Sequence, residues 1–281
     1  HNRCRRQRQM CIRDRILTDN KFFVNWYVRN EENAMHIKKY GKNLSYLRSV
    51  NFNKKKIYVS DSIEEITKSS DIIILAIPSP FLENELRKIK LQLKNKIIFS
   101  ALKGVVPESS LIVSEHLNNY YHVPIKNIGI ITGPCHAEEV ALEKLSYLTV
   151  ASKSKSIGKE MKVALASTYI RVKFSEDTMG VEYASMLKNI YALTAGIAHG
   201  LGYGDNFQSV LISNSVKEMK RFINSVYKIN RDINDSEYLG DLLVTAYSTF
   251  SRNRTLGNML GKGYSLKAVS YTHLTLPTTA I

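Results

Sequence analysis

Two runs of consecutive apolar residues constrain the fold more than any other feature of this sequence. The stretches DIIILAIPS at 71–79 and KIIFSALKG at 96–104 show no alternation of polar and apolar residues. This is typical of strands that are covered on both faces of a parallel sheet. We therefore expect both runs to form central strands of an α/β fold.

Strand and helix patterns alternate in the first part of the chain and then give way to helices alone. Strands are predicted at 22–28, 72–77, 96–102, 127–132, 147–152 and 170–176. Helices are predicted near 30–40, 61–69, 80–91, 108–118 and 155–167, and then at 181–199, 207–226 and 251–260. The pattern favours an α/β, Rossmann-like dinucleotide-binding domain over 16–178, followed by an all-α domain over 179–268.

The two ends differ in composition from the sequence between them. Residues 1–15 and 269–281 continue neither a helical nor a strand pattern, and both resemble translated sequencing adaptors. We expect non-native tails there rather than authentic disordered termini. A dinucleotide fold also needs a first strand and a G-x-G-x-x-G turn before its first helix. Because residues 16–20 resemble the end of that helix, we expect this strand and turn, and the last C-terminal helices, to be truncated.

The formal net charge of +15 raises the question of a nucleic-acid partner. The first fifteen residues, with six arginines and one aspartate, contribute a third of it. The remaining lysines follow amphipathic helices such as 154–164 and 217–228, where a run of charge is usually a solvated face. We expect no nucleic-acid partner, although a basic nucleic-acid-binding module is the alternative of a different class.

Membrane insertion and metal binding are not indicated either. The longest apolar runs, such as Ile72 to Pro78, are far shorter than the roughly 20 residues that a membrane span needs. The three cysteines, at 4, 11 and 135, have neither the spacing of a metal site nor that of a disulfide framework. We expect a cytoplasmic protein without a metal.

Chemically distinctive residues follow several of the predicted strands. Arg29 ends the first strand, where a dinucleotide fold reads the adenosine ribose and a basic side chain favours a 2′-phosphate. Pro78 and Lys103 follow the two apolar strands, and Gly133 opens a tight turn into a helix whose free amides suit an anion. Because ligands bind beyond the carboxyl ends of parallel strands, these residues are candidates for a binding site.

Lys188 is an unusual residue for its helix. It lies in SMLKNIYALTA at 185–195, which is apolar on nearly every side, and a helix of that kind is normally buried. No carboxylate lies three or four residues away on the same helical face. Either the ammonium reaches water along its stem, or it meets a partner from elsewhere in the chain.

Five motifs resemble those of the bacterial-type NAD(P)-dependent glycerol-3-phosphate dehydrogenases, over about 16–268. They are Lys103-Gly104, GPCHAEEVA at 133–141, GVEYASMLKNIYALTAGIAHGLGYGDN at 180–206, GDLLVT at 240–245 and SRNRTLG at 251–257. The resemblance implies the reversible NAD- or NADP-dependent reduction of dihydroxyacetone phosphate to sn-glycerol 3-phosphate, which supplies glycerophospholipid synthesis. It also implies a phosphorylated small-molecule substrate and a homodimer.

The resemblance also implies roles for individual residues. Lys188 would be the catalytic lysine that exchanges a proton with the substrate oxygen, Lys103 would polarise the carbonyl, and Asp241 would orient Lys188. Substrate contacts would come from Lys103, Gly133, Cys135, Asn189, Thr245, Ser251, Arg252 and Asn253. Cofactor contacts would come from Arg29, Pro78, Lys103, Ala137 and Arg252.

Other interpretations of these residues stay open at this point. Asp241 would also suit a helix N-cap before LLVT, and Arg252 a solvated surface position. Cys135 and Asn214 depart from the family, which often has serine or threonine at the first position and usually arginine at the second. The enzyme alternatives are a 3-hydroxyacid dehydrogenase or a ketopantoate reductase, and the chain would be an inactive fragment if the truncation prevents cofactor binding.

Overall fold

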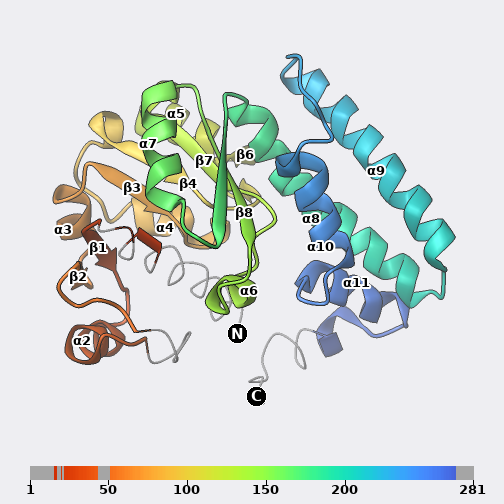
Figure 1. The fold of residues 1–281 in the computed structure, drawn as a ribbon, viewed down its shortest axis with the longest axis horizontal. Coiled ribbons are helices and arrows are strands. Elements are labelled where there is room, and N and C mark those ends of the chain that lie inside the picture. Colours follow the sequence, from red (N-terminus) through yellow and green to blue (C-terminus); the bar gives the residue numbers. More distant parts are fainter. Residues whose placement is uncertain (1–15, 18–19, 21, 44–50, 270–281) are drawn as a thin grey trace. The chain divides into compact units, whose positions relative to one another are not determined.

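The computed structural model describes residues 16–17, 20, 22–43 and 51–269, and these fall into two compact units (Figure 1). The sheet unit contains the residues up to Ile131 together with Cys135–Thr178. The helical unit contains Thr132–Pro134 and the chain from Met179 onward. The domain boundaries expected from the sequence, at 178 and at both tails, stay a prediction.

The sheet unit is built on parallel strands, as the alternating pattern predicts. Five strands pair in the order β3-β4-β7-β8-β9, and β1 and β2 form a separate parallel pair. Their bounds are β1 (Val24–Tyr27), β2 (Ile57–Ser60), β3 (Ile72–Leu75), β4 (Ile97–Ser100), β7 (Ile128–Thr132), β8 (Ser146–Ser152) and β9 (Ile170–Ser175). The pairs β3–β4, β4–β7 and β8–β9 are parallel.

The prediction of two central strands is confirmed for one of them. β4 lies between β3 and β7, and Phe99 within it is fully buried. β3 instead lies at an edge of the five-stranded sheet, and its residues Ile72, Ile73 and Ile74 are only half-buried. The prediction for β3 is wrong for the described residues, because no described strand pairs with its second edge.

Helices of the sheet unit connect and cover these strands. Their bounds are α2 (Glu31–Tyr40), α3 (Ile63–Lys68), α4 (Leu82–Leu86), α5 (Val113–Tyr121), α6 (Ala137–Ala141) and α7 (Lys155–Leu165), with single 3-10 turns η1 (Ser79–Phe81), η2 (Leu93–Asn95) and η3 (Ile125–Asn127). α2 has a recognisable capping residue at each end. The Asn30 side chain accepts a 2.7 Å hydrogen bond from the Asn33 N–H, and Gly41 closes the helix with a left-handed φ of 64°.

Two predicted helices differ from the structure. The helix expected at 80–91 is α4 alone, because Pro80 near its start favours a tight 3-10 turn and the helix stops at Leu86. The helix expected at 108–118 begins only at Val113, because β5 (Val105–Val106) and β6 (Leu111–Ile112) form a short antiparallel hairpin before it. Strands of two residues carry too little periodicity to be seen in a sequence.

Three apolar clusters form the core of the sheet unit, and two of them pack against β3. The first gathers residues such as Ile16, Phe99, Met161 and Leu165, with Ile72 and Ile74 packed against it. The second gathers Leu82, Leu86, Leu93 and Val113, with Ile73 and Ile77 packed against it. Because successive residues of β3 pack against different clusters, the two clusters lie on opposite faces of the sheet.

The helical unit consists of α8 (Thr178–Gly200), α9 (Asp205–Val226), the π-helical turn η4 (Ser236–Gly240), α10 (Asp241–Tyr247) and α11 (Arg252–Gly261). α8 and α11 approach each other through glycines on both helices. A Cβ placed on Gly196 would lie 2.1 Å from the Arg254 carbonyl oxygen, and one on Gly257 would lie 2.1 Å from the Leu193 carbonyl oxygen. Only glycine therefore permits this backbone contact, which holds α11 against α8.

Candidate active site

Lys188 lies in the buried side of α8. Its side chain is 2% exposed, and its neighbours Ala184, Tyr191 and Ala192 on the same face are buried as well. The interpretation in which the ammonium reaches water is therefore wrong. A buried ammonium requires a counter-charge, because the loss of its hydration costs on the order of several kcal/mol.

Asp241 supplies this counter-charge from another helix. It forms an ion pair with Lys188, and the Asp241 side chain is also only 2% exposed. Asp241 begins α10 directly after the π-helical turn η4, a kind of local distortion that is frequent at functional sites. The N-cap interpretation of Asp241 is wrong, because Gly240 stands at the cap position and Asp241 is already inside the helix.

Thr132 completes the surroundings of this pair. Its hydroxyl donates a 3.1 Å hydrogen bond to Oδ2 of Asp241, and Thr132 is buried. Thr132 ends β7 and precedes Gly133, whose φ of 126° lies in the left-handed region. Sequence reasoning missed Thr132, although a single polar residue at the end of an otherwise apolar strand was a usable signal.

The remaining candidates of the helical unit lie on α8, α10 and α11. The Asn253 side-chain amide donates a 2.9 Å hydrogen bond to Oδ1 of Asn189, which joins α11 to α8. Ser251 is the N-cap of α11, and its hydroxyl oxygen accepts a 3.3 Å hydrogen bond from the Arg254 N–H. The Thr245 hydroxyl donates to the Asp241 backbone carbonyl at 2.6 Å.

Arg252 begins α11 and is half-buried, so it is not the fully solvated surface arginine of the alternative interpretation. The structure thus places Lys188, Asp241, Asn189, Thr245, Ser251, Arg252, Asn253 and Gly133 in the same compact unit. Within that unit it joins Lys188 to Asp241, Asp241 to Thr245, and Asn189 to Asn253.

The other candidates belong to the sheet unit. Lys103 is half-buried and lies three residues after the end of β4, and Pro78 precedes η1 after β3. Gly104 has a φ of 127°, and a Cβ on it would lie 3.5 Å from the Ser79 hydroxyl oxygen. The chain segments that leave β3 and β4 therefore converge at the carboxyl edge of the sheet.

Cys135 is half-buried just before α6, and Ala137 is the first residue of that helix, although its side chain lies outside the described ones. Arg29 follows β1 with its side chain 45% exposed, and its guanidinium lies 3.9 Å from a carboxylate oxygen of Glu85. Sequence reasoning missed Glu85, because a glutamate on a short amphipathic helix gives no distinguishing signal.

Glu85 sets the electrostatics beside Arg29. It is buried, it accepts a 2.9 Å hydrogen bond from the Tyr27 hydroxyl, and Lys88 pairs with it at 2.9 Å. Burial, together with this carboxylate, raises the pKa of Tyr27 well above its ordinary value. Because Glu85 offsets part of the Arg29 charge, Arg29 is weaker support for a cofactor with a 2′-phosphate than the sequence alone indicates.

In the described part of the chain, no group of three or more His, Cys, Asp or Glu side chains is placed to hold a metal ion. Over the same residues, every helix is too short or too polar to cross a membrane.

Comparison with known proteins identifies relatives along almost the whole chain. Residues 14–158 match the family profile described as NAD-dependent glycerol-3-phosphate dehydrogenase N-terminus, and residues 177–278 match that of the C-terminus. A glycerol-3-phosphate dehydrogenase [NAD(P)+] of Halalkalibacterium halodurans is 36% identical over 252 residues, which cover 89% of this chain and 72% of the relative. The protein of the same name from Bacillus subtilis is 34% identical over 256 residues, 90% of this chain and 74% of the relative.

The fold is similar to that of a solved structure as well. The glycerol-3-phosphate dehydrogenase of Coxiella burnetii superposes with a TM-score of 0.80 at 24% identity, over 92% of this chain and 78% of that one. At this identity the likeness concerns the fold. It agrees with a Rossmann-like N-terminal domain followed by a helical C-terminal domain.

Proposed function

Because the chain belongs to the NAD-dependent glycerol-3-phosphate dehydrogenase family, we propose that it catalyses the reversible reduction of dihydroxyacetone phosphate to sn-glycerol 3-phosphate with NADH or NADPH. The observation that carries the proposal is the buried ion pair of Lys188 and Asp241. A protein gains little stability from such a pair relative to apolar residues, so its presence favours a chemical role.

In this proposal Lys188 is the proton donor. During reduction its ammonium gives a proton to the oxygen at C2 of dihydroxyacetone phosphate, and in the reverse direction the neutral amine takes it back. Asp241 holds the Nζ atom in place through the ion pair, and the Thr132 hydroxyl fixes the orientation of the Asp241 carboxylate. Lys103, from the sheet unit, polarises the same carbonyl.

The substrate phosphate is assigned to the start of α11. Arg252 presents a guanidinium fork that suits phosphate, and polar side chains surround the start of α11: the N-cap Ser251, then Arg252 and Asn253. The bond from Asn253 to Asn189 sets the position of α11 against α8. Since the hydroxyls of Ser251 and Thr245 already serve their own helices, their proposed contribution is to shape the pocket.

The dinucleotide is assigned to the carboxyl edge of the parallel sheet. The backbone there suits a close approach, because Gly104 has a φ of 127°, which side-chain-bearing residues rarely adopt, and lies beside the Ser79 hydroxyl. By the family resemblance, the residues that would contact the cofactor are Pro78, Lys103, Arg29, Ala137 and Arg252. When bound, the dinucleotide supplies or accepts the hydride.

The proposal extends to the cellular setting. Glycerol 3-phosphate is the backbone precursor of glycerophospholipids, so the reaction would supply their synthesis in the cytoplasm. A homodimer is the assembly that we propose from the family resemblance.

A substrate panel tests the proposed function. Oxidation of NADH and NADPH by the chain is measured with dihydroxyacetone phosphate, with ketopantoate and with a 3-oxo acid, for the unaltered chain and for Lys188→Ala. We expect activity with dihydroxyacetone phosphate alone, and a loss of about 10²–10⁴-fold in kcat for the variant, the range for removal of a general acid. Preference for either of the other substrates would contradict the assignment.

A further inference from the structure

Three side chains of the sheet unit form a hydrogen-bonded series that the proposed dehydrogenase reaction does not use. Ser109 lies in the turn between β5 and β6, His116 lies on α5, and Glu83 lies on α4. Oγ of Ser109 lies 2.9 Å from Nδ1 of His116, and Nε2 of His116 lies 2.9 Å from Oε2 of Glu83. We call these three residues the Ser109 network. A hydroxyl, an imidazole and a carboxylate in this order are typical of a nucleophile, its base and the group that orients the base.

Glu83 determines which ring nitrogen of His116 carries a hydrogen. The Glu83 carboxylate is buried and also accepts hydrogen bonds from Arg87 at 2.7 Å and from the Tyr121 hydroxyl at 3.0 Å. Burial acts to raise the pKa of Glu83, but its hydrogen bonds outweigh this effect, so the carboxyl is ionised at neutral pH. Because an ionised carboxylate only accepts hydrogen bonds, Nε2 of His116 is the donor.

The other ring nitrogen of His116 is then available as a base. In the neutral imidazole with its hydrogen on Nε2, Nδ1 is an acceptor, so the Ser109 hydroxyl donates to it. The His116 side chain is 2% exposed, and its ring stacks on that of Tyr120 with centroids 5.0 Å apart. The base is therefore held in one tautomer and one orientation toward the hydroxyl, as proton removal from a nucleophile requires.

The Ser109 hydroxyl lies in a turn at the surface. Ser109 is half-buried, and its neighbours Glu108 and Ser110 are exposed. Ser110 has a left-handed φ of 56°, and the Leu111 N–H after it lies 3.4 Å from Oγ of Ser109. This N–H is close enough to Oγ to donate to the oxygen of an acyl group attached there, where negative charge develops during acyl transfer.

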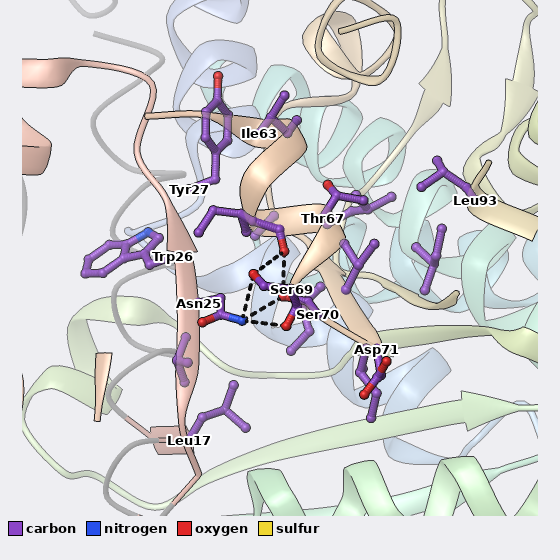
Figure 2. Close-up of a pocket in the computed structure, with 18 of the residues that line it drawn as sticks. Leu17, Asn25, Trp26, Tyr27, Ile63, Thr67, Ser69, Ser70, Asp71 and Leu93 are labelled. Carbon is purple, nitrogen blue, oxygen red and sulfur yellow. Dashed lines mark hydrogen bonds between the residues drawn. The ribbon is translucent and has the colours of Figure 1, made fainter. Parts of the chain in front are cut away.

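The Ser109 network is separate from the cavity that lies between β1 and β3 (Figure 2). That cavity has a volume of about 510 Å³, and Asn25 and Asp71 are among the residues that line it. None of the three residues of the Ser109 network lines it. Since Ser109 lies in a surface turn instead, the network suits small compounds that reach it from solution.

We propose that Ser109 is a nucleophile that small activated carboxylic esters acylate. Oγ attacks the carbonyl carbon of the ester while Nδ1 of His116 takes the hydroxyl proton. The bond from the carbonyl carbon to the leaving oxygen then breaks, and His116 gives the proton to that oxygen. The products are an acyl-serine and a free alcohol or phenol, so no oxidant or reductant is needed. This reaction does not depend on the proposed dehydrogenase activity.

Acetylation of the full chain by 4-nitrophenyl acetate tests the proposal. Trypsin cleaves after Lys103 and Lys126 and leaves Ser109 and Ser110 in one peptide. Acid quenching at successive times, followed by tandem mass spectrometry, gives the acetylated fraction of each serine. We expect Ser109 to be acetylated at least about 10²-fold faster than Ser110, the lower limit for assistance by a general base. This comparison within the unaltered chain does not depend on any variant folding.

Three variants assign the roles within the network. His116→Gln removes the base and should slow acetylation of Ser109 by about 10²-fold or more. Ser109→Ala should lower the rate at which the chain releases 4-nitrophenolate. Ser110→Ala is the matched control, because Ser110 is the exposed neighbour of Ser109 and lies outside the network. It should release 4-nitrophenolate as fast as the unaltered chain.

Two results would overturn the proposal. The first is acetylation of Ser109 and Ser110 at equal rates in the unaltered chain. The second is the absence of acetyl from Ser109 at every time, together with equal 4-nitrophenolate release by Ser109→Ala and the unaltered chain. Either result would leave the Ser109 network with the sole task of anchoring the β5–β6 turn to α4 and α5.

Discussion

At the scale of single residues, Lys188 shows most clearly what the sequence can predict and what only the structure reveals. A lysine in an apolar helix is recognisable from sequence alone, because nothing at helical spacing can balance its charge. Its partner is not recognisable in this way. Asp241 lies far along the chain, and only the packing of α10 against α8 brings the two charges together.

The buried pair leads to a prediction about stability. Either Lys188→Met or Asp241→Asn should lower the free energy of unfolding by about 3–5 kcal/mol, because each leaves one buried charge without its counter-charge. The double variant Lys188→Met/Asp241→Asn should lose less than the sum of the two. Urea unfolding of the four chains measures this coupling, and strictly additive losses would contradict a direct interaction.

Another buried carboxylate, that of Glu83, is stabilised by three donors. Oε2 of Glu83 lies 2.9 Å from Nε2 of His116 and accepts a 3.0 Å bond from the Tyr121 hydroxyl, and Arg87 donates to Oε1 at 2.7 Å. Burial acts to raise the pKa of Glu83, but these hydrogen bonds outweigh it and lower the pKa below its ordinary 4.5. Glu83 therefore contributes stability above about pH 4.5 that is lost as the pH falls through its folded pKa.

Replacement of Glu83 should show this pH dependence. We expect Glu83→Gln to lower the free energy of unfolding by about 1–3 kcal/mol at pH 7 and by progressively less below pH 4.5. The control is the exposed Glu108→Gln, which should change stability by no more than about 0.5 kcal/mol. Urea unfolding at pH 7 and at acid pH gives both values, and a loss at pH 7 that persists undiminished in acid would refute the assignment.

At the scale of elements, long periodic segments were predictable and short ones were not. The helices expected at 181–199 and 207–226 correspond to α8 and α9 within a few residues, because an apolar stripe over five or six turns is unambiguous. β2 was missed, because its four residues follow a run of lysines and carry little pattern. The π-helical turn before Asp241 has no sequence signature of its own, since it results from packing.

The crossing of α8 and α11 gives a prediction at this scale. Gly257→Ala would place a Cβ 2.1 Å from the Leu193 carbonyl oxygen, so the helices must separate. We expect a loss of about 1–3 kcal/mol in stability, together with reduced activity because α11 carries Arg252 and Asn253. Gly204→Ala is the matched control, since no atom lies within 4 Å of its added Cβ and the loss should stay under about 1 kcal/mol. Thermal unfolding of the two variants measures this difference, and equal Tm values would contradict the close approach of α8 and α11.

At the scale of the whole molecule, the sequence predicted an α/β domain followed by an all-α domain, because strand patterns stop partway along the chain and only helical patterns continue. The sequence did not show that β3 is an edge strand, because a continuous apolar run predicts only that both faces are covered and says nothing of its neighbours. Net charge also belongs to this scale. It is +15 for the chain, and a third of it comes from the first fifteen residues.

The charge distribution predicts how the chain binds polyanions such as DNA. Binding to duplex DNA should be weak, non-specific and sensitive to salt, and deletion of residues 1–15 should reduce the slope of log K against log salt by up to about five, one phosphate contact for each arginine lost. A salt titration of both chains measures the slopes. Undiminished binding after the deletion would point to a basic surface elsewhere and revive a nucleic-acid role.

In the proposed reaction, Lys188 and a nicotinamide cofactor act together on the carbonyl of dihydroxyacetone phosphate. Transfer of deuterium from NADH or NADPH labelled at C4 of the nicotinamide ring tests it most directly, with the product analysed by mass spectrometry. We expect glycerol 3-phosphate with one deuterium at C2, formed about 10²–10⁴-fold more slowly by Lys188→Met. Absence of the label at C2, or an equal rate in the variant, would contradict it.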